Sequence, residues 1–180
     1  MKRVSWFTRL AMLVPVAMLV LIAGCNAFQT AEKAHDIVGA VVAVAQADLP
    51  SLQATGVFNA TEAAAVTNYL NLTVTLNGQY QTCITSANSA TLGKKGKLVT
   101  CLDTFAQGLS DPKELAQLRV MRPGAQQQVQ LWITAASIGV SSVVAALGGQ
   151  AVPAPTVSQE RPAVGAQVAF NGRVEAVAGL

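Results

Sequence analysis

The stretch that decides the fold of this chain lies at residues 131–148 and has the sequence LWITAASIGVSSVVAALG. It carries no charge, and no charged residue occurs between Arg122 and Glu160. A helix that is apolar on nearly every face is typical of the centre of a helical bundle. We therefore predict that residues 123–147 form a buried central helix, which ends at Gly148.

The same stretch allows a second interpretation. Its length of 18 residues is close to the shortest that spans a membrane, so residues 131–148 could insert with Arg119 and Arg122 at the membrane edge. Hydroxyl groups, alanines and glycines lower its hydrophobicity, and a glutamine-rich segment precedes it. These features favour the buried helix over the inserted one.

The region before this stretch predicts two long helices. Residues 30–49 carry apolar side chains at the spacing of one helix face, and Pro50 predicts the end of that helix. Asn59 stands three residues before Glu62, which is the pattern of a capping box. A second helix is therefore expected to begin at Asn59.

Residues 70–84 carry conflicting signals. Apolar and polar residues alternate and lead into Asn77-Gly78, which is a strong β-hairpin signal. The segment also continues the apolar stripe of the preceding helix, with Thr73 and Asn77 in its gaps. No other convincing strand lies nearby, and an isolated hairpin is only marginally stable. We therefore predict helix.

The rest of the chain predicts shorter helices and a tail. The basic segment 93–97 is expected to be a loop before a third helix at residues 98–109. Asp111 then caps a short helix. Residues 149–180 are rich in alanine, proline, valine and glycine and predict a flexible tail, with a small hairpin at Asn171-Gly172.

Composition agrees with one folded domain. The chain has 180 residues, of which 52% are hydrophobic and 12% charged, whereas typical soluble domains carry about 25% charged residues. This composition excludes a disordered chain and a nucleic-acid binder with a dense basic patch. The predicted fold class is all-α, a small bundle of four or five helices between residues 30 and 148.

The N-terminus predicts export. Residues 1–24 comprise a basic start, an apolar run over residues 10–22, and small residues before Cys25, which is the layout of a secretory signal. The run is too short for a comfortable membrane span, and Pro15 would interrupt one.

The end of this signal is more specific. Ile22-Ala23-Gly24-Cys25 resembles the lipobox of bacterial lipoproteins. The resemblance implies cleavage before Cys25, a diacylglyceryl group on its thiol, and a lipidated tether at residues 25–29. Two or three acyl chains hold a protein stably at a membrane. The alternatives are an ordinary signal peptide with a chance cysteine, or an uncleaved signal anchor.

The location and the charge of the mature chain follow from this resemblance. Asn26 stands where an aspartate would resemble an inner-membrane retention signal, which implies the periplasmic face of the outer membrane in a two-membrane bacterium. Removal of residues 1–24 takes three basic residues and no acidic one, so 12 basic residues become 9, against 9 acidic ones. The mature chain is formally neutral, and no attraction to nucleic acid is implied.

The mature chain would keep two further cysteines, Cys83 and Cys101. In an oxidising compartment such a pair favours a disulfide, which would stabilise the fold by about 3 kcal/mol. The alternatives are buried free thiols or metal ligands. A zinc site would need more ligands, and the only histidine, His35, is far away in sequence.

Three lysines, Lys94, Lys95 and Lys97, are candidate contacts for anionic lipid headgroups. They lack the spacing of a phosphate-binding loop. A solvated turn between two helices is the interpretation that we favour for them.

No pattern of residues predicts catalysis. Ser110 and Lys113 match the S-x-x-K spacing of penicillin-binding serine enzymes, but the companion motifs are absent and helix capping explains these residues. His35 has Asp36 beside it and Glu32 nearby but no nucleophile to act on. We expect neither an enzyme nor a bound cofactor or metal.

Three functions are compatible with the sequence. The leading one is a membrane-anchored envelope lipoprotein with a structural, scaffolding or partner-binding role, the partner being another envelope protein. The second is a carrier of an apolar ligand, which would require an enclosed cavity above about 300 Å³. The third is a membrane-inserting protein that uses residues 131–148.

Overall fold

The computed structural model describes residues 27–150, 154–157 and 164–179 of the chain. These residues form helices and no strand, so the predicted all-α class is confirmed. The helices are α2 (Ala27–Ala54), α3 (Ala60–Ser89), α4 (Lys94–Leu109), α5 (Pro112–Arg119), α6 (Pro123–Ala146) and α7 (Val164–Ala178).

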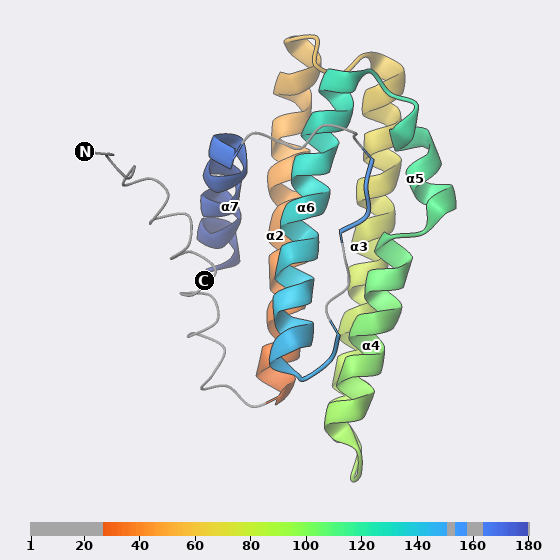
Figure 1. Ribbon diagram of the computed structural model, residues 1–180, viewed down its shortest axis with the longest axis vertical. Helices are drawn as coiled ribbons and strands as arrows, with labels where there is room; N and C mark the ends of the chain where they lie inside the picture. Colours follow the sequence, from red (N-terminus) through yellow and green to blue (C-terminus); the bar gives the residue numbers. More distant parts are fainter. Residues whose placement is uncertain (1–26, 151–153, 158–163, 180) are drawn as a thin grey trace, which may run out of the picture.

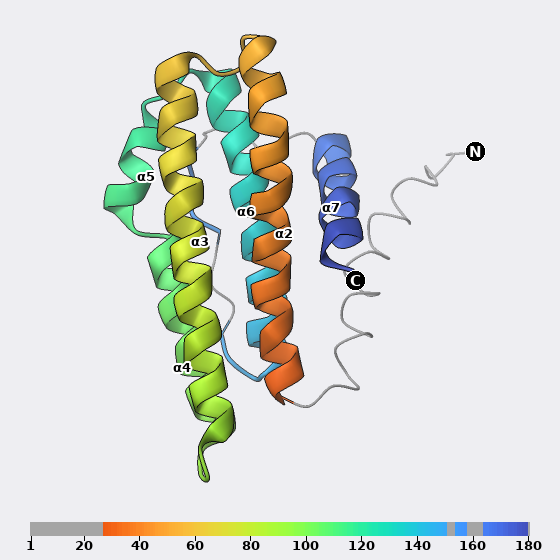
Figure 2. The same ribbon diagram turned by 180° about the vertical axis from the view of Figure 1, so that it is seen from behind.

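Helices α2, α3, α4 and α6 lie side by side along the long axis of the molecule, and successive ones run in opposite directions (Figure 1). The short α5 follows α4 toward the top of that view, and α7 lies outside the bundle against α2 (Figure 2). The start of α2, the α3–α4 loop and the end of α6 form the lower end of the bundle. The α2–α3 loop and the α5–α6 turn form the upper end.

The predicted central helix α6 shares the centre of the bundle with α2. Helix α6 contacts α2, α4, α5 and α7, whereas α2 contacts α3, α4, α6 and α7. The two helices approach closely because Gly139 has no side chain, and a Cβ there would overlap Ile37 of α2. Only one stripe of α6 faces solvent, where Ile138 is 46% exposed. Gly148, with a φ of 78°, follows the last turn, as predicted.

Helix α2 does not end at Pro50, contrary to the sequence-based expectation. It continues to Ala54 with Pro50 inside its last turns, where the ring is exposed to solvent. Thr55 still donates its backbone N–H to the carbonyl of Ser51 at 3.0 Å. The helix ends at Ala54, and the chain turns away at Gly56, whose φ of 78° is a conformation that glycine adopts without strain.

Helix α3 begins at the predicted capping box and runs straight through Asn77-Gly78. The amide of Glu62 donates to Asn59 Oδ1, and the amide of Asn59 donates to Glu62 Oε2, both at 2.9 Å. Asn77 is buried and donates to the carbonyl of His35 on α2 at 3.1 Å. The helical stripe therefore prevails over the local hairpin signal, because only a helix brings this side chain against α2.

Helix α4 begins at Lys94, so the predicted basic loop at residues 93–97 is in fact the first turn of a helix. Gly93 precedes it with a φ of 69°. The amide of Lys97 already donates to the carbonyl of Gly93 at 3.1 Å.

Within the predicted C-terminal tail, residues Val164–Ala178 form helix α7, and the hairpin predicted at Asn171-Gly172 is wrong because both residues lie inside this helix. An isolated helix of this length is only marginal in water. Phe170 and Val174 lie one turn apart and are buried against the bundle. Arg173 binds both carboxylate oxygens of Asp48 on α2, at 2.8 and 2.7 Å. Tertiary packing therefore stabilises the helix.

Candidate functional site

The upper end of the bundle holds a cluster of hydrogen bonds around the carboxylate of Glu62, which is 6% exposed. Its Oε1 accepts from the backbone amide and Nε of Arg122, at 2.9 and 3.1 Å. Its Oε2 accepts from Arg122 Nη2 at 2.7 Å. The same Nη2 donates to the carbonyls of Gly56 and Val57, at 3.3 and 3.1 Å.

This cluster fastens three parts of the chain, namely the α2–α3 loop, the start of α3 and the start of α6. The hydrogen bonds from Arg122 lower the pKa of Glu62 from 4.5 to about 2, although burial acts in the opposite direction. The carboxylate is therefore ionised and fully engaged at neutral pH. Such a group stabilises structure and is not available as a general base.

The interior between α2, α3 and α6 is nearly filled. Its cavity measures about 30 Å³ and is lined by apolar side chains that include Val38, Leu70 and Trp132. A space of that size holds about one water molecule, whereas ligand pockets begin near 300 Å³. A cleft of about 390 Å³ lies at the upper end beside Arg122 and Ala166, but it is open to solvent.

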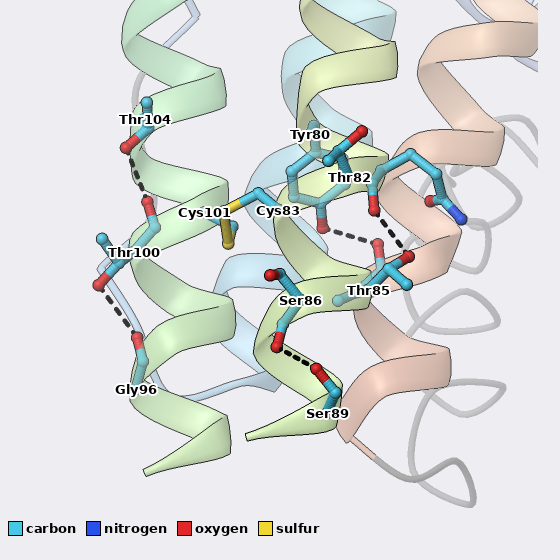
Figure 3. The surroundings of a disulfide bond; sticks show 12 residues. Tyr80, Thr82, Cys83, Thr85, Ser86, Ser89, Gly96, Thr100, Cys101 and Thr104 are labelled. Carbon is cyan, nitrogen blue, oxygen red and sulfur yellow. Dashed lines mark hydrogen bonds between the residues drawn. A yellow bond between two sulfur atoms is a disulfide. The ribbon is translucent and has the colours of Figure 1, made fainter.

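Cys83 and Cys101 form a disulfide that joins α3 to α4 across a Cα–Cα distance of 5.8 Å (Figure 3). This is the pair that the sequence predicts. Next to it, Tyr80 stacks on Phe105 of α4 at 4.9 Å between ring centroids and donates to the carbonyl of Ala31 at 2.7 Å. Burial raises the pKa of Tyr80, which remains a neutral donor. Disulfide and tyrosine together fasten α2, α3 and α4.

The candidate headgroup contacts Lys94, Lys95 and Lys97 are all exposed at the lower end, in the first turn of α4. None of them forms a salt bridge with another described residue. The amine of Lys95 lies beside Gly148 at the end of α6, where 3.5 Å would separate it from an added Cβ. Cations are favoured near such a helix C-terminus.

The candidate lipidation site Cys25 and the predicted signal at residues 1–24 lie outside the described residues. Helix α2 includes Ala27, so residues 27–29 of the predicted tether are helical. Ala27 and Phe28 are partly buried against the core, which explains why they extend the helix. The described part of the helical domain therefore reaches to within two residues of the candidate anchor.

The candidate catalytic residues make only local contacts in the structure. His35 Nδ1 lies 3.2 Å from Asp36 Oδ1 on the protein surface. Ser110 donates its hydroxyl to the carbonyl of Ala106 at 2.9 Å. Asp111 caps α5 by accepting from the amide of Lys113 at 2.8 Å. In the part of the chain that the structure describes, no group of three His, Cys, Asp or Glu residues could hold a metal ion.

The sequence did not predict the contacts of a short segment that precedes α7. Residues 154–157, which we call the strap, lie against α6 and α5. The buried side chain of Gln130 donates to the carbonyl of Pro155 at 3.2 Å and accepts from the amide of Val157 at 2.7 Å. Arg119 Nε donates to the carbonyl of Thr156 at 3.2 Å. A glutamine within an apolar helix was the only local signal.

Two of the described helices, Ala27–Ala54 and Pro123–Ala146, are long and apolar enough to cross a membrane. The most apolar window of α6 is 61% buried inside the bundle. Burial of this kind is typical of a core helix in a soluble domain. The length criterion alone is therefore weak evidence for insertion.

The comparisons with known proteins add no assignment. No family model matches the chain, and neither the curated proteins nor the solved structures contain a match.

Proposed function

We propose that this protein is a lipoprotein of the bacterial envelope, anchored through Cys25, whose helical domain has a structural or partner-binding role at the membrane surface. In a two-membrane bacterium the domain would face the periplasm from the outer membrane. The proposal rests on the lipobox-like sequence Ile22-Ala23-Gly24-Cys25.

The proposed role of the domain rests on two observations, a small interior cavity and cross-links between its helices. The cavity between α2, α3 and α6, of about 30 Å³, is too small for an apolar ligand. The Cys83–Cys101 disulfide and the Arg122–Glu62 pair hold opposite ends of the bundle. Such a domain would bind a partner through its outer surface, whereas a carrier would need space for a ligand inside. The structure therefore favours a scaffold over a carrier.

The anchor is tested by metabolic labelling with an alkyne-tagged palmitate. We expect label on the wild-type chain and none on Cys25→Ala. Absence of label from the wild-type chain, with the protein processed at another position, would contradict the anchor.

The partner role is tested by affinity capture of the intact lipoprotein from detergent-solubilised membranes. Mass spectrometry then identifies bound proteins and lipids. One envelope protein recovered reproducibly in near-equal amount supports partner binding. A co-purifying apolar ligand in equal amount would instead support the carrier.

The apolar length of α6 supports membrane insertion as a second candidate. Alkaline extraction of Cys25→Ala separates the two functions. Once its signal is cleaved, a scaffold without its lipid anchor becomes soluble. An inserted α6 would instead keep the cleaved variant in the membrane.

A further inference from the structure

The α3–α4 loop and the first turn of α4 form the most prominent feature of the lower end. These residues, 90–97, have the sequence ATLGKKGK and are called the tip below. In both views the start of α4 projects beyond the start of α2 (Figures 1 and 2). Leu92 is 82% exposed there. The tip therefore presents a large apolar side chain to whatever lies beyond this end.

The tip is also positively charged. It contains Lys94, Lys95 and Lys97 and no acidic residue. The nearby first turns of α2 add Glu32, Lys33 and Asp36, so these segments together hold four lysines and two carboxylates. An excess of two positive charges remains, from 4 minus 2.

This arrangement has a cost for the free domain. Cations in the first turn of a helix interact unfavourably with the helix dipole. An exposed leucine side chain forgoes the favourable free energy that its burial would provide. An anionic lipid surface would offset both costs, because headgroups attract the lysines and the interface accepts the leucine.

The position of α2 brings the tip and the candidate anchor to the same side of the bundle. Helix α2 includes Ala27 at the lower end, two residues after Cys25. Two residues of chain span at most about 7 Å. An acyl chain on Cys25 would therefore leave the domain at the end that carries the tip.

We propose that the tip docks on anionic lipid headgroups, with Leu92 at the interface and Lys94 and Lys97 in contact with phosphates. The bundle then stands with its lower end on the membrane and its upper end pointing away from it. The inference rests on the proposed lipid anchor and adds to it a defined orientation and a preference for anionic lipid.

The test uses the intact lipoprotein, reconstituted into vesicles of phosphatidylcholine with or without phosphatidylglycerol. One variant is Leu92→Trp. Its matched control is Val120→Trp, because Val120 is 85% exposed and directly follows α5, in the α5–α6 turn of the upper end. Quenching of each introduced tryptophan by brominated lipids is measured against the wild type, whose Trp132 is buried and common to all variants.

We expect strong quenching at position 92 in vesicles with phosphatidylglycerol and little at position 120. Adding Lys94→Gln and Lys97→Gln to the first variant should lower the docked-to-free ratio by about 25-fold at low salt, since each lysine contributes about fivefold. Equal quenching at the two positions, or no difference between the two vesicle types, would overturn the docking.

The intact mass of the same preparation reports the lipid on Cys25 independently. Lipidated protein without selective quenching leaves the anchor intact and refutes the docking. If the protein carries no lipid, the anchor fails, and flotation of the same variants with vesicles still measures the docking. Lysine-dependent flotation would then support it, and its absence would refute it.

Discussion

The two ends of the bundle are stabilised by different kinds of interaction. At the upper end, Arg122 is committed to the buried carboxylate of Glu62 and to two loop carbonyls. Toward the lower end, Cys83 and Cys101 supply a covalent link, while the lysines of the tip pair with no described acid. Arg122 is thus part of the fold at the upper end, whereas the lysines of the tip form no salt bridge with another described residue.

Among changes at the two ends, removal of the disulfide should lower the free energy of unfolding the most. We expect Cys83→Ala/Cys101→Ala to lower the free energy of unfolding by about 3 kcal/mol, because the link constrains the unfolded chain. Denaturant unfolding of the mature protein measures the loss. A reducing agent should bring the wild type to the same value and leave the variant unchanged; a stable reduced wild type would show that the lower end does not depend on this link.

Loss of the charge on Glu62 should have a smaller effect that depends on pH. Glu62→Gln keeps the shape and the capping pattern but loses the charged hydrogen bonds, so we expect a loss of about 1–2 kcal/mol at neutral pH. Because the folded pKa is lowered from 4.5 to about 2, the stabilisation is present above pH 4.5 and disappears as the pH falls toward 2.

Unfolding of wild type and Glu62→Gln across that pH range provides the measurement. Asn59→Ala is a matched control, since it removes the cap at a cost of about 1 kcal/mol but leaves the Arg122 pair. Its difference from the wild type should vary little with pH. A Glu62→Gln difference that stays constant down to pH 2 would contradict the role of the pair.

Neutralising the tip should have the smallest effect on folding. Lys94→Gln/Lys97→Gln removes cations from a helix N-terminus, so stability should rise by about 0.3–0.5 kcal/mol at low salt and change little at high salt. Thermal unfolding in both salt conditions is the measurement. A clear loss of stability would mean that these lysines are structural, as Arg122 is.

Short-range patterns were sufficient for much of the fold. The caps at Asn59 and Asp111 and the glycine end of α6 depend on residues that lie within four positions of one another, and the structure has each of them. The disulfide partner was predictable because only two cysteines follow Cys25. Among the functional candidates, the three lysines were predicted to lie in a loop, whereas the structure places them in the first turn of α4.

Local signals failed where a distant segment decided the outcome. Asn77-Gly78 favours a turn by itself, yet Asn77 is held in a helix by its contact with α2. The C-terminal region by itself predicts a flexible tail with a hairpin, yet residues 164–178 form a helix that packs on α2 through Phe170 and Arg173. Only packing against another helix could settle these cases.

The sequence by itself determined the all-α class, the capped starts of α3 and α5, the disulfide and the candidate anchor, because these follow from neighbouring residues or from simple counting. The tertiary structure decided that Glu62 binds Arg122, that Gln130 holds the strap, and that the tip lies at the same end as the start of α2. These relations join residues that are far apart in sequence, and they exist only once the helices have packed.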